Sequence, residues 1–139
     1  MKKKITIILL ICSIIINIIL GALYFNEKNS VKKHEVLFNY SASFARERLL
    51  EFQQNESQSD FTYAVCNINS MNYALGFLKT TGMETLDFNE LYGLMVLDPY
   101  KFKIYTSDIC EILELLEQDY NDPNAYSKLR IMLNEIKYS

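Results

Sequence analysis

Residues Ile5 to Phe25 read ITIILLICSIIINIILGALYF and contain no Asp, Glu, Lys, Arg or His. As a helix that rises about 1.5 Å per residue, this 21-residue segment spans about 30 Å, the thickness of the hydrocarbon core of a bilayer. Residues 1–4 form a short basic N-terminus before it, and Tyr24 and Phe25 close it where aromatic side chains favour the membrane interface. The sequence therefore predicts one N-terminal transmembrane helix.

A cleaved secretory signal is the alternative interpretation of this segment, because such signals also begin with positive charge. They have a shorter apolar run and small residues at the cleavage site, and Leu20-Gly21-Ala22 supplies a site of that kind. The apolar run continues past this site through Leu23, Tyr24 and Phe25. This continuation favours a helix that stays in the membrane as a signal anchor.

The lysines around the segment predict its orientation. Residues 2–4 are lysines and precede it, whereas Lys28, Lys32 and Lys33 follow it, so the bias under the positive-inside rule is small. A short basic N-terminus before a long apolar run usually delivers the following domain to the outside. We expect a single-pass protein of the cell membrane with its N-terminus inside and its C-terminal domain outside. The abundance of Ile, Asn and Lys is typical of an AT-rich, bacterial genome.

The rest of the chain is predicted to be helical. Residues 26–32 are mostly polar and are predicted to form a short joint, and residues 33–139 are predicted to form one all-helical domain. Apolar residues recur there at alternating steps of three and four, which places them on one helix face. The segments with this spacing are 33–54, 59–81, 87–97, 106–120 and a last one that begins at Pro123. The fold class is therefore all-α, with the membrane helix followed by a small bundle of about four to five helices.

The apolar stripes also predict the core of the bundle. The residues expected to be buried are Phe38, Ala42, Ala45, Leu49, Phe52, Phe61, Ala64, Val65, Ile68, Met71, Leu75, Leu78, Ile109, Ile112, Leu113, Leu116, Tyr120, Tyr126, Leu129, Met132, Leu133 and Ile136. The predicted helices 33–54 and 59–81 each carry a second apolar stripe beside the first. These stripes consist of Val36, Tyr40 and Phe44, and of Tyr63, Cys66, Tyr73, Ala74 and Phe77. Because apolar residues cover both of its sides, the helix of residues 59–81 is predicted to be the most enclosed.

Side chains that accept hydrogen bonds from free backbone amides predict where the helices begin. The predicted caps are Ser59 or Asp60, Asp87, Thr106 or Ser107, and Asp122. Asp87 is the clearest of them, since Glu90 three residues later completes a capping box. Gly82 and Pro99 are expected to end the helices before them, and residues 100–105 to form a loop or a helical turn.

Cys66 and Cys110 are the only cysteines after the membrane segment. Outside the cell, a disulfide between them would close a loop of about 44 residues and stabilise the domain by about 3–4 kcal/mol. Two buried free cysteines are the alternative. The sequence leaves both interpretations open.

The charge of the domain excludes one class of partner. Without the three lysines at residues 2–4, 11 of the 14 basic residues stand against 17 acidic residues, which gives a net charge of −6. An electrostatic field of this sign repels phosphate backbones, so we expect no nucleic-acid partner.

The sequence contains no pattern that indicates catalysis, a metal site or a cofactor. His34 is the only histidine, whereas zinc sites need several Cys or His ligands at close spacing. Glu111, Glu114 and Glu117 lie three residues apart, which is typical of a solvated helix face. A nucleophile elbow, a phosphate-binding glycine loop and a Walker lysine are all missing. We therefore expect a protein that is not an enzyme and has no cofactor.

The domain is rich in tyrosine, which is favoured at protein interfaces because one end of its side chain is apolar and the other polar. Core packing in a chain without tryptophan is the alternative explanation. The predicted contact patch is the loop segment that contains Tyr100, Lys101, Phe102, Lys103 and Tyr105.

These observations favour a membrane-tethered, non-enzymatic interaction module outside the cell: an accessory, immunity or exclusion type of protein, or a subunit of a membrane assembly. Its expected partners are the membrane, through one N-terminal span, and a protein at the membrane surface. A single-pass sensory or regulatory protein that acts through the membrane helix of a partner is the first alternative. A secreted helical protein cleaved near Ala22 is the second.

Overall fold

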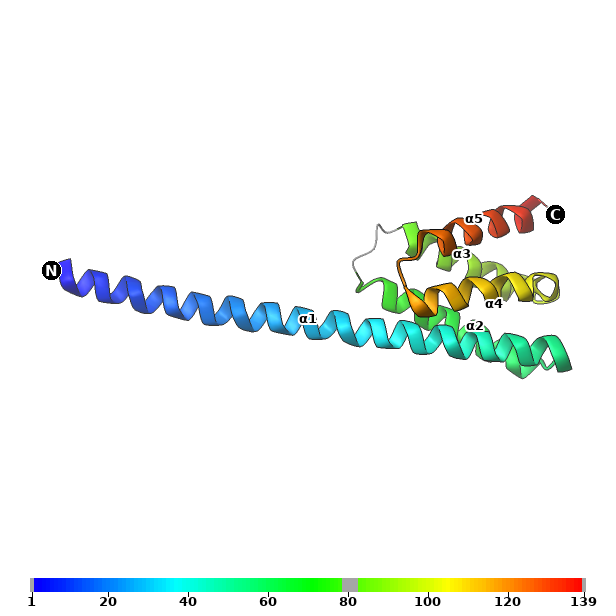
Figure 1. Cartoon of the computed structure of the whole chain (residues 1–139), viewed down its shortest axis with the longest axis horizontal. Helices are drawn as coiled ribbons and strands as arrows, with labels where there is room; N and C mark the ends of the chain where they lie inside the picture. Colours follow the sequence, from blue (N-terminus) through cyan, green and yellow to red (C-terminus); the bar gives the residue numbers. More distant parts are fainter. Residues whose placement is uncertain (1, 79–82, 139) are drawn as a thin grey trace. The chain divides into compact units, whose positions relative to one another are not determined.

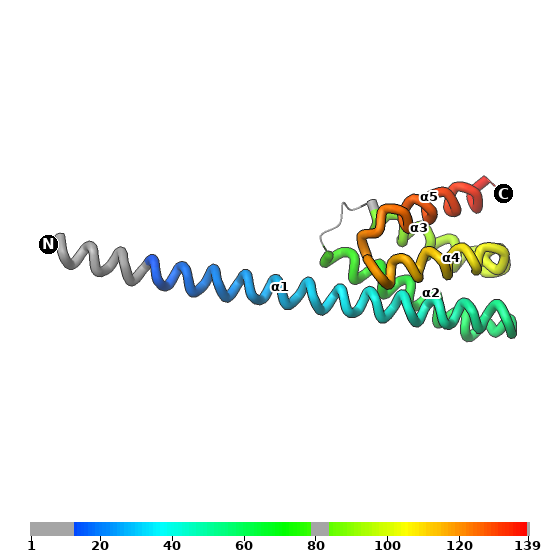
Figure 2. Tube along the Cα trace, in the orientation of Figure 1, coloured from blue at the N-terminus to red at the C-terminus, as the bar shows by residue number. Residues whose placement is uncertain are grey.

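The computed structural model describes the backbone of residues 2–78 and 83–138, and the side chains of residues 13–78 and 84–138. Within these ranges the chain forms five helices and no strand (Figure 1). The helices are α1 (Lys2–Asn55), α2 (Gln58–Leu75), α3 (Met83–Leu97), α4 (Phe102–Gln118) and α5 (Pro123–Tyr138), and Figure 2 follows them in chain order. The predicted all-α fold class is confirmed.

The chain divides into two compact units, Met1–Lys33 and His34–Ser139, and α1 contributes residues to both. Residues 26–32, which we predicted as a polar joint, are part of this helix, so the prediction of a break there is wrong. The reason is that no glycine or proline occurs between Gly21 and Gly76 to interrupt the helix. The charged residues of the predicted joint, Glu and Lys, are themselves good helix formers.

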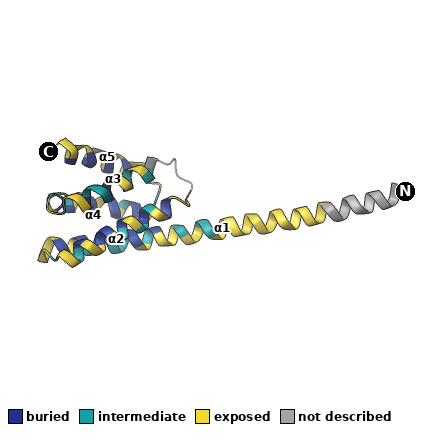
Figure 3. Ribbon diagram, turned by 180° about the vertical axis from the view of Figure 1, so that it is seen from behind, coloured by how far each residue is buried: buried dark blue, intermediate teal, exposed yellow. Residues whose placement is uncertain are grey.

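The first unit contains the predicted membrane segment. Residues 5–12 of that segment lie outside the described side chains. From Ile14 to Phe25 the large apolar side chains are between 50% and 68% exposed, and Figure 3 shows this part of α1 in yellow. Over the part of the chain that the structure describes, none of the helices is both long and apolar enough to cross a membrane.

The second unit is a helical bundle with one core. Within it α2 packs on α3, α3 on α5, and α4 on α5. All the predicted core residues are buried except Tyr120, which follows α4 and is half-buried. From α3 the core gains Phe88, Leu91 and Met95.

The secondary stripes predicted for the first two helices of the domain are largely in solvent. Val36 and Tyr40 are 61% and 59% exposed, and Phe44 is half-buried. On α2 the exposed members are Tyr63, Cys66, Tyr73 and Phe77, and only Ala74 is buried. The prediction that α2 is the most enclosed helix is therefore wrong, because the other helices cover only one of its faces.

Aromatic rings join α1, α3 and α5 in the centre of this unit. The ring centroids of Phe38 and Phe88 lie 6.1 Å apart, and those of Phe88 and Tyr126 lie 6.3 Å apart, both edge-on at 78°. Each such pair contributes about 0.5–1.5 kcal/mol beyond the area that it buries. The hydroxyl of Tyr126 donates a 2.9 Å hydrogen bond to the carbonyl of Tyr120, so the polar end of this buried ring is satisfied.

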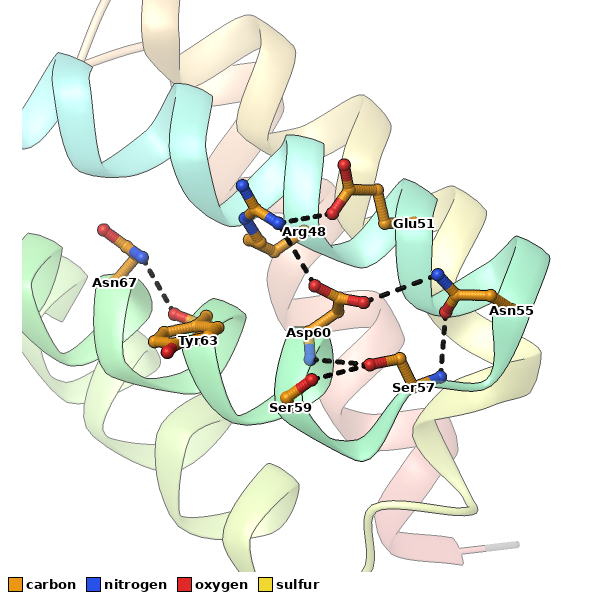
Figure 4. Close-up of polar contacts among 8 residues, drawn as sticks. All are labelled: Arg48, Glu51, Asn55, Ser57, Ser59, Asp60, Tyr63 and Asn67. Atoms are coloured by element: carbon orange, nitrogen blue, oxygen red, sulfur yellow. Dashed lines mark hydrogen bonds and ion pairs between the residues drawn. The ribbon is translucent and has the colours of Figure 1, made fainter.

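Polar side chains hold the turn between α1 and α2 (Figure 4). The Ser57 hydroxyl accepts a 3.3 Å hydrogen bond from the backbone amide of Asp60 and so caps α2. The Asp60 carboxylate accepts hydrogen bonds from Arg48 at 3.2 Å and from Asn55 at 3.5 Å. Hydrogen bonding with Ser57, and then with Arg48 and Asn55, lowers the pKa of Asp60 from its usual value.

The cap of α2 gives a first testable prediction. We expect Ser57→Ala to lower the free energy of unfolding by about 1 kcal/mol, because the amide of Asp60 loses its acceptor. Urea titration of the full chain in detergent, followed by circular dichroism, measures this change. Ser70→Ala is the matched control. Within the described residues the Ser70 hydroxyl bonds only to the carbonyl of Cys66 in the same helix, and we expect a change below about 0.5 kcal/mol. Equal losses in the two variants would contradict the capping role.

The ends of α2 and the start of α3 differ from the predictions. The cap of α2 is Ser57 instead of Ser59 or Asp60, and the helix ends at Leu75. The predicted stop, Gly82, lies outside the described residues.

α3 begins at Met83, four residues before the predicted start at Asp87. The Asp87 carboxylate accepts a 2.8 Å hydrogen bond from Nε of Arg130 on α5, so it joins two helices and caps neither. Burial raises the pKa of Asp87, and the charge of Arg130 opposes this effect. α3 ends at Leu97, before Pro99, as predicted.

α4 begins inside the segment 100–105 that was predicted as a loop or a helical turn. Its first residue, Phe102, is 1% exposed, and the burial of this ring extends the helix ahead of the predicted caps. Thr106, one of those caps, is buried inside the helix, where its hydroxyl donates to the carbonyl of Phe102 at 3.1 Å. α5 begins at Pro123 after Asp122, as predicted.

Candidate functional site

The candidate site is a groove between α2 and α3, called here the α2–α3 groove. It has a volume of about 380 Å³. The residues that line it are Gln58, Phe61, Thr62, Val65, Cys66 and Asn69 of α2, Tyr92, Met95 and Val96 of α3, and Pro99. A volume of this size accommodates a small ligand or a few side chains of a partner.

Helical periodicity brings these side chains to two facing walls. On each helix the lining residues are one, three or four positions apart, so they share one face. Phe61, Val65 and Met95 are buried and form the floor of the groove. Cys66 and Val96 are exposed along its edge, and Val96 is 54% exposed. The groove therefore has an apolar floor and is open to solvent.

The lining of the groove is uncharged. None of the described residues that line it is an acid or a base, although the domain as a whole is acidic. The Thr62 hydroxyl donates a 2.8 Å hydrogen bond to the carbonyl of Gln58, so it is satisfied within its own helix. The side-chain amides of Gln58 and Asn69, the thiol of Cys66 and the hydroxyl of Tyr92 are the other polar groups of the lining. Such a surface suits an apolar or uncharged partner.

A scan against protein-family models, a search of curated proteins and a search of solved structures each found no significant match. The chemistry of the groove is therefore inferred from its own residues.

Sequence reasoning found only part of this groove. Cys66 belongs to the secondary stripe that we predicted on α2, and this stripe is the face that the bundle leaves in solvent. Val96 was not singled out, Pro99 was noted only as a residue that ends a helix, and Tyr92 only as one of many tyrosines, because their approach to α2 depends on how α2 and α3 pack. Of this secondary stripe only Cys66 lines the groove, whereas Phe61 and Val65 come from the predicted core stripe of the same helix.

The predicted contact patch is split between the core and the surface. Phe102 is buried and contributes nothing to an exposed surface. Nζ of Lys101 donates a 2.9 Å hydrogen bond to the carbonyl of Ile136 near the end of α5. Lys103 forms an ion pair with Glu56, which follows α1. Tyr105 is half-buried, whereas Tyr100 is 80% exposed. Tyr100 is therefore the most exposed aromatic residue of the predicted patch.

Cys66 and Cys110 are both free thiols in the structure, and the disulfide that the sequence allowed stays a prediction. Cys66 lies exposed at the edge of the α2–α3 groove. Cys110 is buried on α4, where its thiol donates to the carbonyl of Arg46 at an S···O distance of 3.8 Å. Burial raises the pKa of Cys110 to about 11, and the charge of Arg46 acts in the opposite direction.

The raised pKa of Cys110 makes stability depend on pH. The folded state holds the thiol proton up to about pH 11, compared with an ordinary pKa of 9.0. Its stabilising contribution is therefore complete below pH 9.0 and is lost as the pH rises to about 11. We expect the midpoint of thermal unfolding to fall over this range, and to fall less steeply in Cys110→Ala. Cys66→Ala is the control and should keep the wild-type slope; a wild-type slope in Cys110→Ala would contradict this linkage.

The remaining residues singled out in the sequence make separate contacts. The ring of His34 stacks on Phe77 with centroids 4.2 Å apart. Glu117 forms a 3.1 Å ion pair with Arg46, and Glu111 pairs with a lysine of α5. Among the residues with described side chains, no three His, Cys, Asp or Glu residues form a group able to hold a metal ion.

A second hollow lies between α4 and α5 and has a volume of about 280 Å³. Its lining consists of Asp108, Glu111, Ile112, Lys128, Ile131, Met132 and Glu135. Unlike the α2–α3 groove, it carries charges of both signs, and Glu111 and Lys128 pair with each other across it. Its polar groups are thus partly satisfied within the domain.

Proposed function

We propose that the chain is a membrane-tethered, non-enzymatic interaction module whose helical domain lies outside the cell. The observation that carries the proposal is the segment Ile5–Phe25, which has no ionised side chain in 21 residues. As a helix it is long enough to cross about 30 Å of hydrocarbon. Such a segment is most stable where its apolar side chains are removed from water.

The exposed side chains of α1 support a lipid surrounding for this segment. Ile14, Ile15, Ile16, Ile18, Ile19, Leu20, Leu23, Tyr24 and Phe25 are all at least half exposed. Successive residues of a helix are about 100° apart, so these side chains cover most of its circumference and leave only the face of Asn17 and Gly21. A helix that is apolar all round belongs in a protein core or in a bilayer. Because these side chains are exposed in the folded chain, the bilayer is the surrounding that we propose.

The α2–α3 groove is the proposed docking surface for a partner protein. Its floor of Phe61, Val65 and Met95 is apolar, and its edge at Cys66 and Val96 is accessible. A partner that inserts a few apolar side chains would bury them there without bringing a charge out of water. Attachment to the membrane raises the effective concentration of the two proteins, so that modest contacts suffice.

The anchor is tested by extraction of bacterial membranes. We expect the full chain to stay in the membrane pellet after alkaline carbonate treatment and to be released by detergent. Ile15→Lys together with Ile18→Lys should move it to the soluble fraction, because each charge near the centre of a membrane helix costs about 2.5–3.5 kcal/mol. N-terminal sequencing of the recovered chain completes the measurement. A soluble wild-type chain that begins near Leu23 would contradict the proposed membrane anchor and favour the secreted alternative.

The docking surface is tested by one charge substitution in the groove. Val96→Asp places a carboxylate in an uncharged groove, and we expect it to reduce partner binding by about tenfold or more, which is about 1.4 kcal/mol. Photo-crosslinking followed by quantitative mass spectrometry of the detergent extract measures the bound partner. Ile131→Asp is the matched control, since Ile131 is also an exposed apolar residue, at 58%, but lies in the hollow between α4 and α5. Equal binding by the two variants argues against the groove.

A single-pass sensor is the second candidate function, and the continuity of α1 favours it. This helix runs from Lys2 to Asn55 and so includes both the proposed membrane segment and the first helix of the domain bundle. A sensor of this kind would act through the membrane helix of a partner.

A further inference from the structure

Asn17 is a polar side chain near the middle of the proposed membrane helix. Its carboxamide is exposed, and within the described residues it takes part in no hydrogen bond. Asn67 in α2 provides a comparison, because its amide donates a 2.8 Å hydrogen bond to the carbonyl of Tyr63 one turn earlier (Figure 4). Such a bond satisfies one donor only, whereas a carboxamide has two N–H donors and an acceptor oxygen.

Lipid offers no partner for these groups. Hydrocarbon neither donates nor accepts hydrogen bonds, so an unpaired amide is strongly unfavourable there. The short side chain of Asn17 does not reach the interface, because the nearer end of the segment, at Phe25, is about 12 Å away along the helix. The amide therefore favours a second membrane helix with a donor and an acceptor at the same depth.

The helix face around Asn17 allows another helix to come close. Ser13 and Gly21 lie one turn before and after it on the same face. A Cβ atom added to Gly21 would meet nothing within 4 Å. Small residues on either side of a polar one let two helix backbones approach to hydrogen-bonding distance. The opposite face carries Ile15 and Ile19, which are bulky and β-branched.

We infer that α1 pairs with α1 of a second copy of this chain through Asn17 within the bilayer. This inference rests on the proposed membrane function. A second copy is favoured because a carboxamide is self-complementary: across a twofold axis the two Asn17 side chains face each other, and each donates an N–H to the oxygen of the other. The segment has no charged side chain, so it offers no counterpart to a charged partner helix.

Energy transfer in vesicles of phosphatidylcholine and phosphatidylglycerol tests this pairing. Full chains labelled with donor or acceptor at the C-terminus should show transfer above the level of random co-localisation, and excess unlabelled chain should lower it. Asn17→Leu should weaken association about threefold to twentyfold, as expected for one interhelical hydrogen bond in a membrane. Gly21→Leu should weaken it by blocking close approach, and Asn17→Gln should retain most of it. Ile19→Leu, on the opposite face, should match the wild type.

Carbonate extraction of the same vesicles shows whether the chains have inserted, and so distinguishes two kinds of negative result. Chains that insert but show only random transfer overturn the pairing and leave the anchor standing. Wild-type transfer in both Asn17→Leu and Gly21→Leu also overturns it. Chains that do not insert overturn the proposed membrane function, and the pairing with it.

Discussion

The edge-on contact between Phe38 and Phe88 is the interaction on which the second unit depends. Both rings are fully buried, and Phe88 also contacts Tyr126, so three helices meet at one aromatic group. Because Phe88 fixes which face of α3 points inward, Tyr92 and Val96 fall on the side that meets α2. The position of the α2–α3 groove is therefore a consequence of how the core packs.

Much of this core could be predicted from helical periodicity. The stripe from Phe38 to Phe52 and the stripe from Tyr126 to Ile136 are both buried as predicted, because burial on a helix repeats with the period of the helix. The end of α3 before Pro99 and the start of α5 at Pro123 were also predictable. Proline restricts the backbone locally, so its effect requires no knowledge of the remaining fold.

Other features depend on residues that are far apart in the chain. Asp87 fits a capping box by its neighbours, yet it pairs with Arg130, 43 residues later. Phe102 lies in a segment that alternates apolar and polar residues, and its burial in the core makes that segment helical. The groove beside Cys66 exists because the bundle covers one face of α2 only. None of these outcomes is encoded in a short window of sequence.

The uncharged lining of the groove also has a consequence for the conditions under which it binds. Dissolved salt screens charges over a Debye length of about 10 Å at 0.1 M, but it does not weaken the burial of apolar surface. Contacts made on Phe61, Val65 and Met95 would therefore keep their strength as ionic strength rises, whereas exposed ion pairs such as that of Glu111 with Lys128 would lose theirs. Adhesion through this surface is suited to surroundings whose salt content varies widely.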